Sequence, residues 1–296
     1  MHFWREVKDG SGSFVRLSEN PDTDTAVVFV HGFIGDPIGT WGEFHRLVDD
    51  VKYAKHFDTA DLFFYQYPST RLTVPVAAEK FVAFLGRVFP TPPASLLELH
   101  PETSKLLGKL KVPDCPRPLL GSYQKLVLVG HSLGGVLIRQ MVWATLKGKY
   151  NKTLSPPAPA TLKKASVVLF APAQGGFRLD AELKEAFAAM GLSLIRVWWA
   201  ARRAPVYNDL IRPEPILSAI QKGTIALDTG AFKSANCLRA DTVWGEKEVV
   251  VHLVDYEDLD TPLSPYPAGI DHVTVCKPTP GFDVPLTKVA DGIARA

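Results

Sequence analysis

Cysteine is scarce in this sequence. Its 296 residues include three cysteines, Cys115, Cys237 and Cys276, which are far apart and odd in number. This spacing matches neither a disulfide framework nor a set of metal ligands. Because disulfides are rare in reducing compartments, the scarcity favours a cytoplasmic protein, and no metal site is expected.

Long apolar runs and clusters of one charge sign are missing too. No uninterrupted apolar stretch reaches the roughly 20 residues that a membrane-spanning helix needs. The first residues lack the apolar core of a secretory signal peptide. The formal net charge is +2, with basic and acidic residues mixed along the chain, so no basic stripe suited to nucleic acid is present. We therefore expect neither a nucleic-acid partner nor a membrane span.

Short apolar runs alternate with helical patterns along the chain, which is 46% hydrophobic. The runs predict strands at 26–30, 61–66, 126–129, 165–170, 240–244 and 249–254. Helices are predicted within 43–51 and over 76–89 and 285–296, and a hairpin over 3–17. This alternation is typical of an α/β fold, a mostly parallel central sheet with helices on both faces. Length and composition suit a single domain over residues 1–296.

Two stretches are predicted to be insertions into this fold. Residues 90–118 contain seven prolines and directly precede a strand, which indicates a surface insertion. Residues 179–225 are predicted to form a helical cap, because apolar side chains crowd residues 187–199. The crowded stretch fits three interpretations: a core helix, a mobile cap over an apolar pocket, or a Trp-rich contact with a membrane surface.

The most informative motif is Gly-His-Ser-Leu-Gly at residues 130–134. It follows a predicted strand and precedes an apolar helical pattern. Strand, sharp turn and helix form the context of a nucleophile elbow, in which Ser132 would lie on a strained turn. Side chains at Gly130 and Gly134 would collide with the neighbouring strand and helix. The alternative interpretation is an ordinary glycine-rich turn.

A serine nucleophile needs a base within hydrogen-bonding distance, and the base needs an acid that orients it. On such a sheet the order along the chain is Ser, acid, His. His272 follows the last predicted strand and precedes the closing helix, so it is the predicted base. His252 falls in an apolar run and is interpreted as a strand residue. His31 and His131 are expected to be structural, orienting backbone or loops near the site.

The acid has several candidates. Glu248 is favoured, because Gly-x-x-acid after the strand at 240–244 would place a carboxylate at the top of the sheet. Glu246 is the next candidate, followed by Asp255 and Asp260. If both glutamates are solvated loop charges, the acid lies elsewhere.

Two backbone N–H groups are predicted to form the oxyanion hole, which holds the negative charge that develops on a substrate oxygen. One belongs to Leu133, which follows the nucleophile. The other belongs to Phe33, within His-Gly-Phe-Ile-Gly at residues 31–35. Both groups lie in loops after adjacent buried strands, which is the geometry that such a site requires.

These motifs, with Asp271-His272 and Cys-Lys-Pro at 276–278, resemble the α/β-hydrolase superfamily. The chain is most similar to a lipase-like branch that includes the GPI inositol-deacylases and the serine-active-site-containing proteins. The resemblance runs in order over roughly residues 26–278, apart from the two insertions. It implies ester hydrolysis through an acyl-enzyme, without metal or organic cofactor. The family usually has Asp where this chain has Glu248, which is chemically competent.

We therefore predict a serine hydrolase that cleaves carboxylic esters, in the manner of an esterase or lipase. Acyl transfer or amide hydrolysis by the same residues is one alternative. A hydrolase-fold scaffold or membrane-associated binding protein without turnover is another. The partner is expected to be a small-molecule or lipid ester. The apolar stretch at 187–199 predicts an apolar acyl group and offers a peripheral contact with a membrane.

Overall fold

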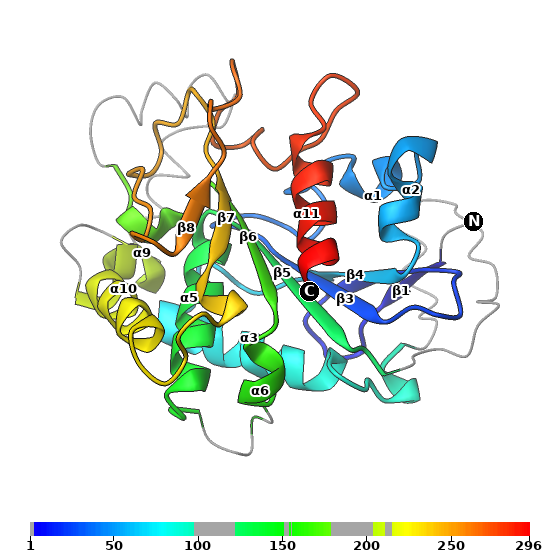
Figure 1. The fold of residues 1–296 in the computed structure, drawn as a ribbon, viewed down its shortest axis with the longest axis horizontal. Helices are drawn as coiled ribbons and strands as arrows, with labels where there is room; N and C mark the ends of the chain where they lie inside the picture. The colour runs from blue at the N-terminus through cyan, green and yellow to red at the C-terminus, as the bar shows by residue number, and fades with distance from the viewer. Residues whose placement is uncertain (1–2, 98–121, 151–153, 155, 179–203, 211–214) are drawn as a thin grey trace.

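The structure is a computed structural model that describes residues 3–97, 122–150, 154, 156–178, 204–210 and 215–296. Within these residues the chain forms an eight-stranded sheet with strand order β1-β2-β4-β3-β5-β6-β7-β8 (Figure 1). The strands are β1 (Phe3–Glu6), β2 (Phe14–Leu17), β3 (Thr25–Val30), β4 (Ala60–Tyr65), β5 (Lys125–His131), β6 (Ser166–Phe170), β7 (Ala240–Val243) and β8 (Asp260–Pro262).

Strands β3 to β8 run parallel to one another, while β1 and β2 form an antiparallel hairpin at one edge. All residues of β3 and β4 are buried, as their continuous apolar runs predict for strands covered on both faces. Val28 of β3 pairs with Phe63 of β4 on one side and with Leu128 of β5 on the other. The predicted α/β fold with a mostly parallel sheet is confirmed.

Helices cover both faces of this sheet (Figure 1). One face carries α1 (Phe44–Leu47), α2 (Val51–Phe57) and α11 (Val284–Arg295), and the other carries α3 (Val74–Val88), α5 (Leu133–Leu146) and α10 (Pro215–Asp228). Helix α11 packs against β5 and β6, while α5 packs against β5, α3 and α10. The shorter elements are α6 (Pro159–Leu162), α9 (Pro205–Leu210), η1 (Ala94–Leu97), η3 (Ala173–Gly175) and η4 (Asn236–Leu238).

One predicted strand is wrong. Residues 249–254 form a loop, in which Val251 makes an isolated bridge with Phe177. The valines have the side chains of a strand, but the backbone N–H groups of Val250 and Val251 donate to the Glu248 carboxylate instead of to a strand. The eighth strand is β8, whose three residues are mostly exposed and therefore lack the apolar pattern of a buried strand.

The predicted insertions lie largely outside the described residues. The structure describes neither residues 98–118 of the proline-rich stretch nor residues 179–203 and 211–214 of the predicted cap, which include the Trp-rich residues 187–199. The rest of the predicted cap forms α9 and the first part of α10. Leu217 and Ile220 of α10 are buried where this helix packs on α5, so α10 belongs to the helical layer of the sheet.

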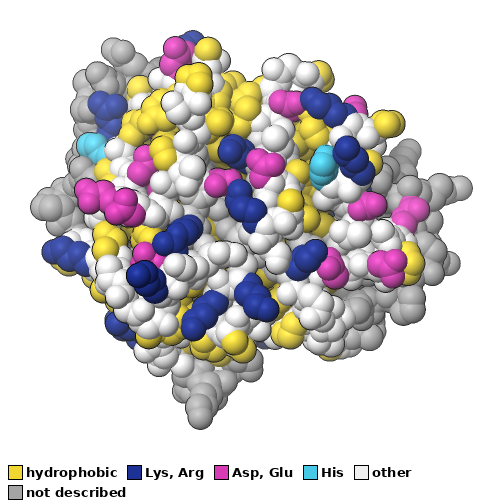
Figure 2. Space-filling model, viewed as in Figure 1, with side chains coloured by type: hydrophobic (Ala, Val, Ile, Leu, Met, Phe, Trp, Pro, Cys, Tyr) yellow, Lys and Arg dark blue, Asp and Glu magenta, His cyan; other side chains and the backbone are white. Residues whose placement is uncertain are grey.

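The parallel strands place several loops at one edge of the sheet. The residues that follow β3, β5, β6, β7 and β8 all leave the sheet at the carboxyl ends of the strands, where ligands bind in folds of this kind. On the face drawn in Figure 2, acidic and basic side chains are scattered among polar and apolar ones. None of the helices in the described part of the chain has the length and apolar character needed to cross a membrane.

Candidate active site

Ser132 lies on the sharp turn between β5 and α5. Its backbone φ is 53°, in the left-handed region that non-glycine residues rarely adopt. The N–H of Ser132 donates to the Phe170 carbonyl (3.0 Å), and its own carbonyl accepts from Gly135 (3.0 Å) and Ala173 (3.1 Å). These bonds hold the strained residue between β6 and the first turn of α5, at the edge where the loops gather.

Glycines allow helix α5 to lie directly against the sheet. A Cβ at Gly134 would lie 2.0 Å from the Val30 carbonyl oxygen of β3, and one at Gly130 would lie 2.8 Å from the Cα of Gly135. Both separations are far below van der Waals contact, so the elbow would have to open to admit side chains. The collisions predicted from the sequence are confirmed. A side chain at position 134 would collide with strand β3, and one at position 130 would collide with helix α5.

The structure brings Ser132, His272 and Glu248 together. His272 Nε2 is 3.0 Å from Ser132 Oγ, and His272 Nδ1 is 2.8 Å from Glu248 Oε2. The three residues follow β5, β8 and β7 respectively. All three are buried, and only 1% of the Glu248 side chain is exposed.

Hydrogen bonds on the far side of the carboxylate orient Glu248. Its Oε1 accepts the N–H groups of Val250 (2.8 Å) and Val251 (3.1 Å), which leaves Oε2 for His272. Both oxygens of the carboxylate therefore have partners that fix its orientation. Since Oε2 accepts, the imidazole proton lies on Nδ1, and Nε2 presents its lone pair to the hydroxyl of Ser132.

The turn that carries His272 has its own supports. Asp271 Oδ1 accepts the N–H groups of Val273 (3.0 Å) and Thr274 (2.8 Å), and the Thr274 hydroxyl accepts the N–H of Asp271 (3.0 Å). Burial opposes ionisation of Asp271, but hydrogen bonds to its carboxylate, first that from the Thr274 hydroxyl (2.7 Å) and then the two from backbone N–H groups, lower the pKa of the carboxyl. The buried thiol of Cys276 donates to the Thr40 carbonyl (3.1 Å), which fastens the turn to the loop after β3. The spacing Asp-x-x-Thr is a sequence signal for such a turn.

The two predicted oxyanion donors are available. Within the described residues, neither the N–H of Phe33 nor that of Leu133 donates a hydrogen bond to the protein. The loop of Phe33 approaches the nucleophile closely, because a Cβ at Gly32 would lie 2.9 Å from the Cβ of Ser132. Backbone N–H groups without a partner in the protein are the kind of donor that an oxyanion hole requires.

His31 fixes the peptide unit between Gly32 and Phe33. Its Nδ1 is 2.8 Å from the Gly32 carbonyl oxygen, which also accepts from the N–H of Gly35 (3.1 Å). In a planar trans peptide, the carbonyl and the following N–H point in opposite directions. Because the Gly32 carbonyl points toward His31, the Phe33 N–H points away from His31. The sequence predicted only that His31 would orient backbone or loops.

The ring of His31 is itself held in a neutral state. It stacks on Tyr67 with 4.4 Å between ring centroids, and its Nε2 faces the N–H of Tyr67 (3.4 Å). Burial lowers the pKa of His31 to about 4. A neutral imidazole carries one proton, and the two partners require that proton on Nδ1.

The other carboxylates proposed as the acid have different partners. Glu246 accepts the N–H of Gly269 (2.7 Å) at the surface. Asp255 accepts from the Thr242 hydroxyl and from the Trp244 indole N–H (3.0 Å each). Asp260 is buried in an ion pair with Arg139. His252 lies in the loop after β7, where its N–H donates to the Gly176 carbonyl (3.0 Å).

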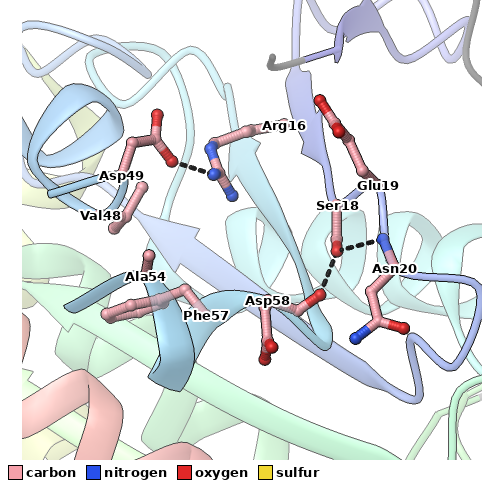
Figure 3. A pocket seen from close by; sticks show the side chains of 9 residues that line it. All are labelled: Arg16, Ser18, Glu19, Asn20, Val48, Asp49, Ala54, Phe57 and Asp58. Carbon is pink, nitrogen blue, oxygen red and sulfur yellow. Dashed lines mark hydrogen bonds and ion pairs between the residues drawn. The ribbon is translucent and has the colours of Figure 1, made fainter. Parts of the chain in front are cut away.

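A pocket of about 520 Å³ is lined by none of the predicted site residues (Figure 3). It is lined by residues of β2 and α2 and of the segments that follow β2, α1 and α2, namely Arg16, Ser18, Glu19, Asn20, Val48, Asp49, Ala54, Phe57 and Asp58. Arg16 pairs with Leu62 near the amino end of β4, so this pocket is at the sheet edge opposite to the loops that carry Ser132. Among the described residues, no group of three or more His, Cys, Asp or Glu side chains is placed to bind a metal ion.

Comparison with known proteins identifies the family. A profile described as the alpha/beta hydrolase family matches residues 27–291. The chain belongs to the alpha/beta hydrolase family. Ser132, Glu248 and His272 follow β5, β7 and β8 in that order along the chain. A search of curated protein sequences gave no match.

Solved structures share the fold of this alpha/beta hydrolase. Carboxyl esterase 2 from the mycorrhizal fungus Tuber melanosporum superposes with a TM-score of 0.52 at 16% identity, covering 99% of this chain and 84% of that one. An esterase from the fungus Rhizomucor miehei gives a TM-score of 0.51 at 18% identity, covering 99% and 81% of the two chains. At identities this low, the superpositions show a shared fold and no more.

Proposed function

We propose that this alpha/beta hydrolase is a serine esterase that cleaves carboxylic esters through an acyl-enzyme. The observation that carries the proposal is the pair of hydrogen bonds from Ser132 through His272 to Glu248, at 3.0 and 2.8 Å. Family membership and the esterase names of the two fungal relatives agree with ester hydrolysis.

In the first half-reaction, Ser132 Oγ attacks the ester carbonyl carbon while its proton passes to His272 Nε2. The N–H groups of Phe33 and Leu133 donate to the oxygen that becomes negative. The bond to the leaving alcohol then breaks, and His272 returns the proton to that alcohol. The products of this half-reaction are a free alcohol and an ester between the acyl group and Ser132.

In the second half-reaction, water replaces Ser132 as the nucleophile. His272 Nε2 takes one proton of the water as its oxygen attacks the acyl carbon. The tetrahedral intermediate collapses, the proton returns to Ser132 Oγ, and the carboxylic acid leaves. No metal or redox cofactor takes part in either half-reaction of this proposal.

Glu248 acts on the base in both half-reactions. Its Oε2 holds the His272 proton on Nδ1, so that Nε2 is free to accept one from the nucleophile. When His272 becomes an imidazolium, the buried carboxylate at 2.8 Å stabilises the positive charge. Because Oε1 is occupied by two backbone N–H groups, the carboxylate keeps this orientation through the cycle.

Apolar side chains in the loops at the carboxyl ends of the strands support an ester with an apolar acyl group. Phe33, in the loop after β3, contacts Phe177, with 6.4 Å between ring centroids. Leu253 and Tyr266, in the loops after β7 and β8, are among the exposed large hydrophobic residues. We propose that the substrate is a small-molecule or lipid ester. The contribution of residues 187–199 stays a prediction, because they lie outside the described residues.

A fluorophosphonate probe tests the proposal directly, because it reacts with activated serines. The wild-type protein should be labelled and should hydrolyse p-nitrophenyl butyrate, and Ser132→Ala should lose both properties. Ser218→Ala, on helix α10, is the matched control and should keep both. Labelling that persists in Ser132→Ala, or a folded wild type that is never labelled, would refute the proposal. Transfer of the acyl group to an added alcohol would identify an acyltransferase that uses the same residues.

A further inference from the structure

The ring of His131 lies between the loop of Gly32 and Phe33, which follows β3, and the turn that carries His272. Its Nε2 is 2.7 Å from the backbone carbonyl oxygen of His272. On its other side, a Cβ at Gly32 would lie 3.1 Å from Nδ1. The rings of His131 and His272 are 4.9 Å apart, measured between centroids. One side chain thus contacts the loops after β3 and β8 while its backbone belongs to the elbow.

These contacts determine which nitrogen of His131 carries the proton. A carbonyl oxygen can only accept, so Nε2 is the donor. Nδ1 is buried and has no hydrogen-bond partner among the described residues, so a second proton there would lack an acceptor. Burial, and after it the nearby His272, lowers the pKa of His131 to about 3; Lys277 and His31 act in the same direction. The ring is therefore a neutral donor.

We propose that His131 is a positioning residue for the base: its Nε2–H holds the His272 backbone and thereby sets the approach of His272 Nε2 to Ser132 Oγ. The inference rests on the proposed function, since it assigns a part to His131 in that reaction. His131 immediately precedes Ser132, and its own backbone pairs with Phe170 at the end of β5. The rigid elbow that carries the nucleophile therefore also fixes the backbone of the base.

A neutral donor suits this position for an electrostatic reason. His272 becomes positively charged during each half-reaction, and a second cation at 4.9 Å would oppose that charge. Lysine or arginine would also donate to the carbonyl, but each would carry a permanent charge. A histidine kept neutral by burial supplies the hydrogen bond without the repulsion.

Loss of this hydrogen bond should loosen the base without unfolding its turn. The Asp271–Thr274 bonds and the Cys276–Thr40 bond remain when His131 is replaced. What changes is the link between the turn and the elbow, so the distance from His272 Nε2 to Ser132 Oγ becomes less well defined.

Two substitutions separate this link from simple packing. Glutamine places an N–H at about the reach of Nε2, so His131→Gln keeps the donor. Leucine fills a similar volume without a donor, so His131→Leu keeps only the packing. His56→Gln, at an exposed position of α2, is the control for replacing a histidine.

We expect kcat for p-nitrophenyl butyrate to fall about tenfold in His131→Leu, with KM changed less than about twofold, because a small misplacement of the base acts on the chemical step. The rate of fluorophosphonate labelling should fall in parallel. His131→Gln should stay within about threefold of wild type in both rates. Wild-type rates in His131→Leu, or equal losses in folded His131→Gln and His131→Leu, would overturn the inference.

Nuclear magnetic resonance of the imidazole nitrogens tests the geometry without any turnover. His131 should carry its proton on Nε2 and stay neutral down to pH 5. The Nδ1–H of His272 should exchange with water faster in His131→Leu than in His131→Gln. A proton on Nδ1 of His131, or equal exchange in both variants, would refute the inference. If the wild type is not labelled by fluorophosphonate, the proposed function fails, and these spectra still decide whether His131 holds His272.

Discussion

Gly245 lies directly against Ile270. A Cβ at position 245 would be 2.4 Å from the carbonyl oxygen of Ile270, which is too close for any side chain. This contact lets the loops after β7 and β8 run side by side, with the N–H of Lys247 donating to that same carbonyl (2.9 Å). The parallel path of the two loops brings Glu248 within hydrogen-bonding distance of His272, although 24 positions separate them in the chain.

Replacing Gly245 by alanine should therefore impair the site more than the fold. The added Cβ forces the two loops apart, so Glu248 can no longer reach His272 in its present geometry. We expect kcat to fall roughly 10- to 100-fold, because positioning errors of about 1 Å have effects of that size. The free energy of unfolding should fall by about 1–3 kcal/mol, as is typical of overpacked sites. Steady-state kinetics and urea unfolding measure the two effects.

Gly281→Ala provides the matched control for that experiment. Nothing lies within 4 Å of a Cβ at Gly281, and its backbone is outside the left-handed region. Activity and stability should both stay close to wild type. If Gly245→Ala behaved in the same way, the argument that this close approach holds acid and base together would be wrong.

Glu248→Gln tests the acid without changing its size. Glutamine can offer an amide oxygen to His272 but no negative charge, so it neither stabilises the imidazolium nor enforces the proton on Nδ1. We expect kcat to fall about 10⁴-fold, the loss found when such an acid is replaced by its amide. Glu246→Gln should keep full activity, because Glu246 bonds the Gly269 N–H at the surface. Comparable losses in both variants would contradict the assignment.

The sequence predicted the parts of the fold that rest on continuous burial. Strands such as β3 and β5 are apolar throughout because the sheet is covered on both faces, and this pattern is visible without coordinates. It also predicted which residues the structure brings together, because the order Ser132, Glu248, His272 follows from the order of the strands. Their catalytic roles are still a proposal.

The remaining features depend on long-range contacts that leave weak local signals. Val250 and Val251 have the composition of a strand, yet their N–H groups bind the Glu248 carboxylate. Strand β8 includes a proline and exposed residues, so no apolar pattern marks it. The bond from His131 to the His272 backbone spans 141 positions, and nothing near either residue in the sequence indicates it.

Acid should destabilise the protein over a range set by its buried histidines. The ordinary pKa of a histidine is 6.5. In the folded protein the pKa of His31 is lowered to about 4 and that of His131 to about 3. Both groups are neutral in the folded state and take up protons on unfolding below pH 6.5. Their contribution to stability is therefore complete above pH 6.5 and is lost as the pH falls toward 4 for His31 and toward 3 for His131. Each group contributes a slope of about 1.4 kcal/mol per pH unit in that range.

Urea unfolding between pH 7 and 4 measures this slope. His31→Gln should reduce this slope by the contribution of one proton, about 1.4 kcal/mol per pH unit, because glutamine does not titrate. This holds whatever the substitution does to the free energy of unfolding at pH 7. His56→Gln should leave the slope unchanged, since His56 is exposed in α2. Equal slopes in wild type and His31→Gln would show that His31 is not buried as a neutral group.

The start of helix α3 provides a last test, which concerns the helical layer. Thr73 precedes α3 but makes no side-chain cap, and Asp209 of α9 instead accepts the N–H of Val74 (2.6 Å). A carboxylate at a helix N-terminus satisfies an unpaired N–H and interacts favourably with the helix dipole. We expect Asp209→Ala to lower the free energy of unfolding by about 1–2 kcal/mol. Asp209→Asn keeps an acceptor oxygen and should lose less. Asp209 lies on α9 and Val74 on α3, so a loss of stability confined to Asp209→Ala would establish that this bond joins the two helices in solution. Wild-type melting curves for both variants would show that it does not.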